Sequence, residues 1–343
     1  MVEVAPVVEP LRDRIRATVF PLVAGQETGA LIDFPDHSNV GDSAIWAGAE
    51  AVLRDAGMAI GYRCDPETYN PAHLRQSVPA GPIFINGGGN LGDVWRRHQR
   101  LREEVLQDFP DRPIVQLPQT VHFEHPENLD AARRAFDAHV NFTLLVRDHV
   151  SLELIRSKFR ARSALCPDMA FYLGRLHREQ PPDVDILWLR REDREAAAGK
   201  VAVPSDVLVC DWLDERVPAL RRVRRVLRPL AVREPRSLRV MNRALGAAYD
   251  RQARLRLREG CRLLARGKVV ITDRLHAHIL CLLMGIPHVL LDNNYGKLSS
   301  FWQAWTAEVD NVRWAGSPSD AVRLAGELTE ALSRESAKER ARG

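Results

Sequence analysis

The residues best suited to chemistry lie in segment 272–278, which reads Thr-Asp-Arg-Leu-His-Ala-His and follows an apolar run. We expect a strand and then a helix, with Asp273 as the helix cap and with Arg274 and His276 in the first turn. Helix N-termini attract anions, and an imidazole gives or takes protons near neutral pH. The segment therefore predicts an anion site beside an acid or base. The alternative is a structural role for all three residues.

Segment 36–42 joins a predicted strand to a predicted helix. Its Asn39 and Gly41 allow an unusual turn, and Asp42 is placed to cap the helix. The helix N-terminus would again attract an anion. The alternative is a capped turn that binds nothing.

Two further segments carry a cation where a predicted strand ends. In segment 146–151, Arg147 can hold a carboxylate or phosphate with two parallel hydrogen bonds. The alternative there is a surface pair or cap formed with Asp148. In segment 292–297, Lys297 adds a cation on the same edge of the sheet or is solvated.

A glycine run occupies residues 86–93, directly after a predicted strand. Glycines let a ligand approach the backbone closely. The run fits the dinucleotide pattern G-x-G-x-x-G, but such a site needs an acidic residue after the next strand, and this chain has Pro-Gln-Thr at 118–120. We therefore favour an anion or sugar cradle over a nicotinamide or flavin site, with a tight turn as the alternative. No cluster of His, Cys and carboxylates has metal-site spacing, so no metal is predicted.

Alternating strands and helices must position these segments. Short apolar runs predict strands over residues 30–34, 82–86, 114–117, 142–146, 185–189, 206–210, 268–272 and 288–291. Helical periodicity predicts helices over residues 42–56, 94–109, 128–139, 150–159, 241–264, 275–284 and 319–332. Such alternation is typical of βαβ units in parallel sheets, so the predicted class is α/β.

The predicted organisation is two Rossmann-like domains. They cover residues 1–175 and 184–332, joined by a polar linker over 176–183 and followed by a charged tail over 333–343. Ligands of such domains bind at the carboxyl ends of the strands, so we expect a cleft there, between the domains.

Composition excludes several classes of protein. The chain has 343 residues, of which 45% are hydrophobic and 27% charged, so a disordered chain, a collagen-like fibre and a disulfide scaffold are excluded. A net charge of +4 is too small to indicate nucleic-acid binding. The 5 cysteines form no CxxC pair, and no leader or membrane-spanning stretch is visible. We expect a cytoplasmic protein with reduced thiols.

Taken together, these segments resemble the polysaccharide pyruvyl transferase family, especially its bacterial exopolysaccharide-biosynthesis members. Blocks occur in order over residues ~30–305: H-x-N-x-G-D from His37, GGGNLGD from Gly87, R-D-x-x-S from Arg147, T-D-R-L-H from Thr272, and G-I-P followed by D-N-x-Y-G-K from Gly285. The resemblance implies two facing Rossmann-like domains similar to those of two-domain (GT-B-like) glycosyltransferases.

The resemblance also implies an activity. Pyruvate would pass from phosphoenolpyruvate to a sugar of a surface polysaccharide, or of its lipid-linked repeat unit, giving a pyruvate ketal and phosphate. Phosphoenolpyruvate is then a donor substrate, and no cofactor is implied. The catalytic candidates are His276, Arg274, Arg147 and Asp42. The substrate-binding candidates are Asn39, Gly41, Gly87, Gly88, Gly89, Asn90, Asp93, Leu275, Asn293, Tyr295 and Lys297.

Ketal formation suggests how two of these residues act. The enol methylene must be protonated before the neighbouring carbon is attacked, and His276 is the candidate acid. Asp42 is the weaker candidate for a base on the acceptor hydroxyl.

Two other classes of function stay open. One is a nucleotide-sugar-dependent glycosyltransferase of polysaccharide biosynthesis, which would share the architecture. The other is a carbohydrate- or anion-binding regulator, which would be favoured if a motif cation were missing. Arg147, Arg274 and His276 are all present.

An arginine-rich stretch, residues 216–262, departs from the family pattern. Within it, four arginines at 3–4 spacing share one face of the predicted helix: Arg251, Arg254, Arg258 and Arg262. The stretch is either a solvated surface or a patch for anionic lipid. In the second case the protein would be peripheral at the inner face of the cell membrane.

Overall fold

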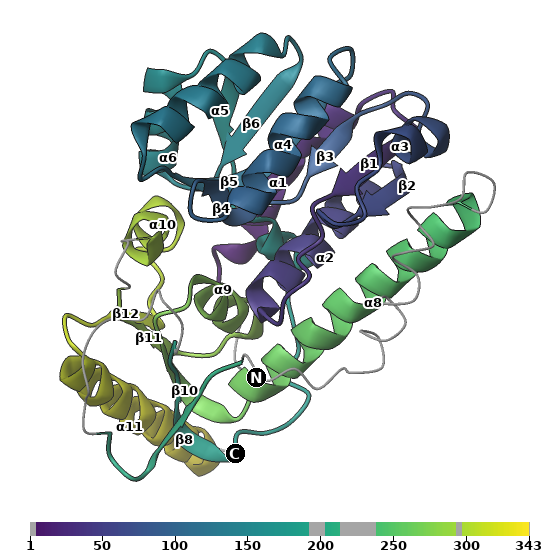
Figure 1. The fold of residues 1–343 in the computed structure, drawn as a ribbon. Coiled ribbons are helices and arrows are strands. Elements are labelled where there is room, and N and C mark those ends of the chain that lie inside the picture. The colour runs from purple at the N-terminus through teal and green to yellow at the C-terminus, as the bar shows by residue number, and fades with distance from the viewer. Residues whose placement is uncertain (1–4, 192–202, 213–237, 293–296, 343) are drawn as a thin grey trace. The chain divides into compact units, whose positions relative to one another are not determined.

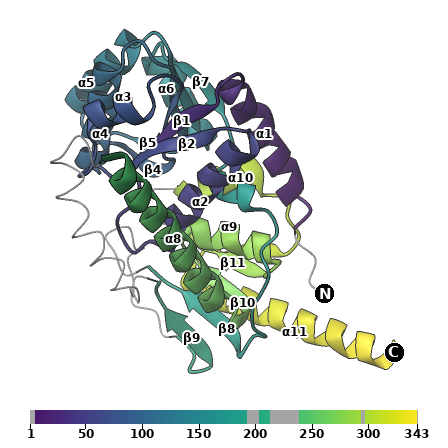
Figure 2. The same cartoon turned by 90° about the vertical axis from the view of Figure 1, so that its right-hand side faces the viewer.

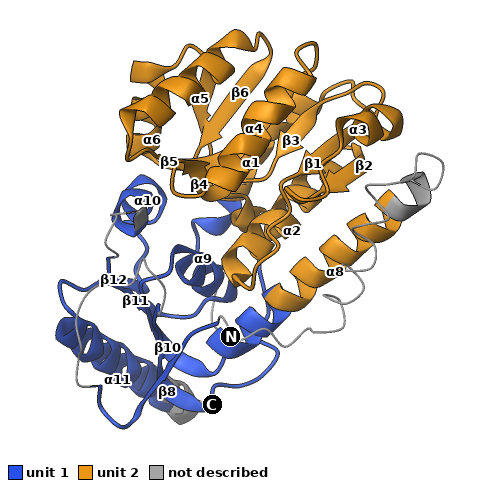
Figure 3. Cartoon of the chain, in the orientation of Figure 1, with its two compact units in different colours: residues 1–10, 174–214, 257–343 blue, residues 11–173, 215–256 orange. Residues whose placement is uncertain are grey.

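The computed structural model describes residues 5–191, 203–212, 238–292 and 297–342. The chain divides into two compact units (Figure 3). Unit 1 consists of residues 1–10, 174–214 and 257–343, and unit 2 of residues 11–173 and 215–256. Helix α8 (Leu238–Leu264) begins in unit 2 and ends in unit 1.

In the described residues of unit 2, seven parallel strands form one sheet (Figure 1). They are β1 (Thr28–Ile32), β2 (Ala59–Cys64), β3 (Ile83–Ile85), β4 (Gly88–Gly92), β5 (Ile114–His122), β6 (Phe142–Val146) and β7 (Arg162–Leu165). Their order is β2-β1-β3-β5-β6-β7, and β4 pairs with β5. The helices of this region are α1 (Val8–Val23), α2 (Val40–Asp55), α3 (Pro71–Ser77), α4 (Arg96–Asp108), α5 (Pro126–Ala138), α6 (His149–Lys158) and the 3-10 helix η1 (Met169–Leu173).

Apolar side chains fix which helices cover which face of this sheet. Leu74 of α3, Leu101 of α4, Phe136 of α5 and Ile155 of α6 share one buried cluster with strand residues such as Ile85. Along the strand order, the chain moves from β1 to β2 in one direction and from β2 through β3, β5 and β6 to β7 in the other. Because parallel crossovers are right-handed, α2, which connects β1 to β2, lies on the other face of the sheet. There α2 packs against η1.

The strand order of unit 2 reverses direction between β1 and β3. In open parallel sheets, ligands bind outside the carboxyl ends of the strands at this switch point. Asp33 and Asn86 follow β1 and β3 directly, so they lie at that position.

The first part of α8 belongs to unit 2 through buried polar contacts. The Tyr249 hydroxyl donates to Asp65 Oδ2 at 3.0 Å, and Trp46 Nε1 donates to Asp250 Oδ1 at 2.9 Å. Phe34 stacks on Tyr249 with ring centroids 4.3 Å apart. This part of α8 thereby fixes the loops that follow β1 and β2.

The described part of unit 1 contains a five-stranded parallel sheet. Its strands are β8 (Val184–Leu189), β9 (Val207–Cys210), β10 (Gly267–Thr272), β11 (His288–Leu290) and β12 (Val312–Trp314), in the order β12-β11-β10-β8-β9. Helix α11 (Pro318–Arg342) buries Ala321 and Ala325 on one face, and α9 (Leu275–Met284) covers the other (Figure 1). Helix α10 (Lys297–Trp305) connects β11 to β12. The switch point here lies between β8 and β10, where Arg274 follows β10.

The α/β class and the parallel Rossmann-like sheets are confirmed, and each predicted strand and helix occurs. The last helix is longer than expected, since α11 runs through the charged segment to Arg342, and Figure 2 shows it extending beyond the sheet. That segment is rich in Ala, Glu, Lys and Arg, which are strong helix formers. The GT-B-like arrangement and the predicted domain limits stay predictions. Among the described residues, no helix has the length and apolar character that crossing a membrane requires.

Candidate active site

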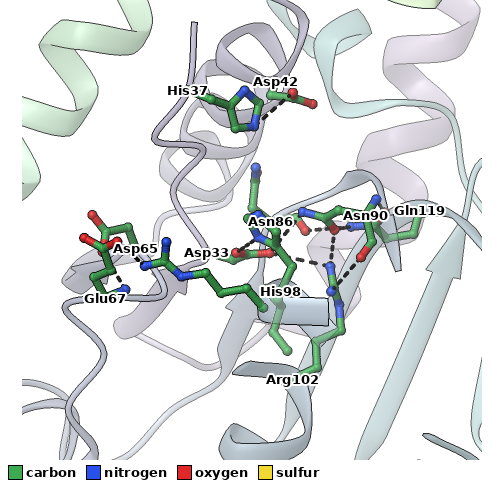
Figure 4. Close-up of polar contacts among 12 residues, drawn as sticks. Asp33, His37, Asp42, Asp65, Glu67, Asn86, Asn90, His98, Arg102 and Gln119 are labelled. Carbon is green, nitrogen blue, oxygen red and sulfur yellow. Dashed lines mark hydrogen bonds and ion pairs between the residues drawn. The ribbon is translucent and has the colours of Figure 1, made fainter. Parts of the chain in front are cut away.

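Asp33 is the centre of a buried polar cluster at the switch point of unit 2 (Figure 4). Its φ is 69°, a left-handed conformation that is uncommon outside glycine. One carboxylate oxygen lies 2.6 Å from His98 Nδ1, and the other lies 3.5 Å from Arg102 Nη2. Backbone strain of this kind is typical of functional sites.

Arg102 of α4 is fully buried, and amide side chains surround its guanidinium. Its Nε donates to Gln116 Oε1 at 2.6 Å, and its Nη2 donates to Asn90 Oδ1. Gln119 Nε2 also donates to Asn90 Oδ1, at 2.8 Å. The cluster is therefore one connected network of side chains from β4, β5 and α4.

Charge balance explains how this network tolerates burial. Burial alone would raise the pKa of Asp33, but the His98 and Arg102 charges and hydrogen bonds from His98 and Asn90 outweigh it and lower that pKa. Burial lowers the pKa of Arg102 to about 10, against the opposing charges of Asp33 and Glu103. Both groups are thus charged at neutral pH.

Sequence analysis missed Asp33, His98 and Arg102. A signal was available, because His98 and Arg102 stand four residues apart on one face of the predicted helix 94–109. Nothing in the pattern, however, showed that Asp33 would face them.

Asn39, not Asp42, caps α2, so the predicted cap was wrong. Helix α2 begins at Val40, two residues earlier than expected, and Asn39 Oδ1 accepts from Gly41 N at 3.0 Å. Asp42 lies in the first turn, where a negative charge is favourable. Its Oδ2 lies 3.4 Å from His37 Nε2, and both side chains are partly exposed.

The glycine run forms strand β4 and not a turn. Gly88 and Gly92 have φ values of 131° and 132°, which other residues rarely adopt. A Cβ at Gly92 would lie 1.7 Å from the carbonyl oxygen of His122 on β5. The backbone conformation at both positions, together with backbone packing at Gly92, therefore explains these two glycines without a ligand.

Arg147 lies beside this strand and is buried. Its Nη1 lies 2.6 Å from Asp168 Oδ2, and its Nε donates to Thr120 Oγ1 at 2.9 Å. A Cβ at Gly89 would lie 3.2 Å from Arg147 Nη2. Of the alternatives for this segment, the surface pair with Asp148 is wrong because both residues are buried, and the cap is confirmed: Asp148 caps α6, accepting from Ser151 N at 2.7 Å.

Asp93 holds the loop that follows β5. Its two carboxylate oxygens accept from Glu124 N and His125 N, both at 2.8 Å, and Oδ2 also accepts from Asn128 Nδ2. Burial would raise the pKa of Asp93, but these hydrogen bonds lower it. These contacts describe a structural carboxylate.

In unit 1, Arg274 itself stands at the N-cap position of α9, and both Arg274 and His276 are buried. Arg274 Nη2 lies 2.6 Å from Asp211 Oδ2, and Arg274 N donates to Thr272 Oγ1 at 3.1 Å. The predicted cap Asp273 is wrong, since that carboxylate instead accepts from Arg191 N at 3.2 Å. Burial raises the pKa of Asp273.

His278, the second histidine of the motif, is structural. Its Nδ1 lies 2.6 Å from His288 Nε2, and its Nε2 lies 2.8 Å from Thr306 Oγ1. Burial lowers the pKa of His278, and that of His288 to about 4. Because His288 Nδ1 must donate to the Ile286 carbonyl, the neutral pair has one consistent set of tautomers that fixes α9 to β11.

The structure thus gathers the candidates in two places. In unit 2 the candidates lie at the start of α2, in and beside β4, and directly after β6, and in unit 1 they are Arg274, Leu275 and His276. Asn293 and Tyr295 lie outside the described residues, as does the side chain of Lys297. Within the described ranges, no group of three or more His, Cys, Asp or Glu residues could hold a metal ion.

Acidic partners neutralise part of the arginine face on α8. Arg258 Nε and Arg262 Nε lie 2.9 and 2.8 Å from the carboxylate oxygens of Glu179. Arg254 Nη1 lies 3.7 Å from Glu50. This face therefore fits a solvated surface, whereas residues 216–237 of the arginine-rich stretch lie outside the described part.

Known proteins match this chain over most of its length. The family model described as polysaccharide pyruvyl transferase matches residues 39–295. Pyruvyl transferase 1 of Schizosaccharomyces pombe is 32% identical over 304 residues, covering 82% of this chain and 70% of that protein. EpsO of Bacillus subtilis is 29% identical over 284 residues, covering 82% of this chain and 86% of that protein. A functionally uncharacterised Klebsiella pneumoniae protein has a similar fold, with a TM-score of 0.58, 16% identity, and coverage of 90% and 99% of the two chains.

Proposed function

Because this chain belongs to the polysaccharide pyruvyl transferase family, we propose that it makes a pyruvate ketal from phosphoenolpyruvate. The enzyme class, a pyruvyl transferase with a saccharide acceptor, follows from the family. The donor and the ketal product go beyond it. The acceptor would be a sugar of a surface polysaccharide or of its lipid-linked repeat unit, and phosphate would be released.

The observation that supports this donor is that Arg274 and His276 both stand at the start of α9. Phosphoenolpyruvate carries a carboxylate and a phosphate, and helix N-termini and guanidinium groups both bind such anions. An anion beside an imidazole favours its protonated form, which can then donate to carbon. Arg274 is thus assigned to the donor anion and His276 to the proton. Arg147 is assigned to the donor on the family resemblance.

The proposal is tested by incubating the protein with phosphoenolpyruvate and a panel of aryl glycosides. Mass spectrometry should find a pyruvyl unit added to one glycoside, with one phosphate released for each product. A parallel arm uses nucleotide sugars as donors, and a third adds a chelator. Glycosyl transfer without pyruvyl transfer would contradict the proposal, and loss of activity on chelation would contradict the metal-free reaction that we propose.

Arg274 should contribute to donor affinity. We expect Arg274→Ala to weaken phosphoenolpyruvate binding by about 1.5–3 kcal/mol, the usual worth of a hydrogen bond to a charged group. Isothermal titration measures this. Arg266→Ala is the matched control. Arg266 pairs with Asp183 and directly precedes β10, so it lies at the amino end of that strand, whereas Arg274 follows the carboxyl end. Equal affinity in Arg274→Ala and wild type would remove Arg274 from the donor site.

A lipid-linked acceptor would bring the protein to anionic lipid. Each arginine near such a surface contributes about 1 kcal/mol of binding. We expect wild-type protein to sediment with anionic liposomes at low salt, and substitution of four arginines by Gln to reduce this: Arg221, Arg222, Arg224 and Arg225. Arg258→Gln with Arg262→Gln is the control, since Glu179 and Glu259 already form ion pairs with these two arginines. Wild-type protein that ignores anionic liposomes would end the membrane proposal.

A further inference from the structure

We propose that His98 is the general base that deprotonates the acceptor hydroxyl, with Asp33 as its positioning residue. The proposal rests on the proposed function, since it assigns a second proton transfer in the same reaction. It is carried by the buried contact between the two side chains, by the cavity beside them and by the conformation of Asp33.

The contact with Asp33 determines which nitrogen of His98 can act as a base. An ionised carboxylate only accepts hydrogen bonds, so Nδ1 of His98, 2.6 Å from Asp33 Oδ1, carries the hydrogen. In the neutral ring, Nε2 then has the free lone pair. Among the described residues, none makes a hydrogen bond to Nε2. The buried carboxylate also stabilises the imidazolium that forms after proton uptake, as in other Asp–His pairs.

His98 borders a cavity of about 340 Å³ in unit 2. This volume lies within the range of small-molecule sites. Trp95, which is half exposed, is also part of the cavity wall. An indole offers an apolar face and an N–H group, which suits the C–H face and hydroxyls of a sugar ring. His98 therefore stands where a saccharide fits.

Two features of the buried cluster around Asp33 support ligand binding beside it. Asp33 holds its left-handed backbone conformation at the switch point of the sheet, where ligands bind. Asn86, which follows β3, is almost fully buried, and its Oδ1 has no hydrogen-bond partner among the described residues. A hydroxyl donor would satisfy that oxygen.

Several charged groups surround His98 and will shape its response to pH. The loop after β1, the loop after β2 and helix α4 supply Asp33, Asp36, His37, Asp65, Glu67, Arg96, Arg97 and Arg102. Arg97 is paired with Glu67 at 2.7 Å. Asp33 is the group in direct contact with the ring.

The acceptor oxygen bonds to C2 of phosphoenolpyruvate while its proton passes to His98 Nε2, and the C2–C3 double bond takes one proton at C3. The C2–O bond to phosphate then breaks, and the oxygen of a second hydroxyl bonds to C2 while its proton passes to phosphate. The two protons that the hydroxyls lose therefore equal the one gained by the new methyl group and the one gained by phosphate. His98 returns its proton to water.

The test is the pH dependence of kcat/KM in His98→Gln. A general base produces the acid limb of such a profile and contributes about 10²- to 10⁴-fold to the rate. We expect His98→Gln to lose that factor and its acid limb, while phosphoenolpyruvate affinity stays unchanged. Imidazole added to His98→Ala should restore part of the rate. His125→Gln, an exposed histidine of the same unit, is the control.

Asp33→Asn tests the positioning role separately. It should keep Nδ1 bonded but remove the anion that stabilises the imidazolium, so the acid limb should move to lower pH and the rate should fall. Asp42→Asn is the competing variant. An acid limb that disappears in Asp42→Asn and persists in His98→Gln would overturn the assignment, and so would full activity in His98→Gln. If wild-type protein forms no pyruvylated product with any acceptor, the proposed function itself fails, and the base assignment with it.

Discussion

We expect His276→Ala to lower turnover about 10²- to 10⁴-fold, the usual contribution of a positioned acid. His276 lies in the first turn of α9. Without an acid there, C3 of phosphoenolpyruvate must be protonated from solvent, so the chemical step slows. Donor binding should persist, because Arg274 is still present. Steady-state kinetics and titration with phosphoenolpyruvate measure the two effects.

His276→Gln complements this variant, because it keeps a polar side chain of similar size but cannot act as an acid. It should be as slow as His276→Ala. His177→Gln changes an exposed histidine of the same unit and should be neutral. Circular dichroism confirms that each variant is folded. Turnover near the wild-type rate in either His276 variant would contradict the acid assignment.

The second large effect concerns stability. We expect Arg102→Met to lower the free energy of unfolding by about 3–5 kcal/mol, because it leaves one member of a buried ion pair without its partner. Arg102 is fully buried and bonds to Gln116 and Asn90 as well as facing Asp33. Methionine keeps most of the apolar stem, so the loss reports mainly on charge and hydrogen bonds. Urea unfolding followed by far-UV circular dichroism measures it.

Arg100→Met provides the matched control on the same helix. Arg100 is exposed, and surface substitutions usually change stability by less than about 0.5 kcal/mol. Adding Asp33→Asn to Arg102→Met should recover part of the loss, because the carboxylate oxygen that faced Arg102 then no longer carries a buried negative charge. If the free energy of unfolding of Arg102→Met lies within about 1 kcal/mol of the wild-type value, the stability of the network does not depend on the ion pair.

Local patterns predicted eight of the twelve strands that the structure describes, and helix α9, because each of these elements consists of contiguous residues. Residues 269–272 are all β-branched, and β10 (Gly267–Thr272) differs from the predicted strand 268–272 by one residue. The positions of Arg274 and His276 at the start of α9 could be predicted for the same reason, since a strand end and a helix start are adjacent in sequence. The anion site there stays a prediction. The helix caps were harder to predict. Because α2 starts two residues before the predicted helix, Asn39 and not Asp42 is its N-cap residue.

The cluster around Asp33 could not be predicted from spacing. Asp33 and His98 are separated by 65 residues, and the strand order of the sheet alone brings their segments together. His98 occupies an ordinary polar position in a helix, and Asp33 directly follows a strand whose last three residues are apolar. Only the fold shows that the carboxylate turns towards the imidazole and is buried with it.

The two glycines of β4 bear on how relatives of this protein are compared. Any single-base change that replaces a glycine by another amino acid adds a Cβ. Gly88, at a φ of 131°, does not accommodate a Cβ, and neither does Gly92, where it would meet His122. Selection for folding alone therefore retains them. Under the roles proposed above, a descendant that had lost pyruvyl transfer would keep the glycine signature while His276 and Arg274 drifted. Those two residues, and not the glycine run, would then distinguish active members from inactive ones.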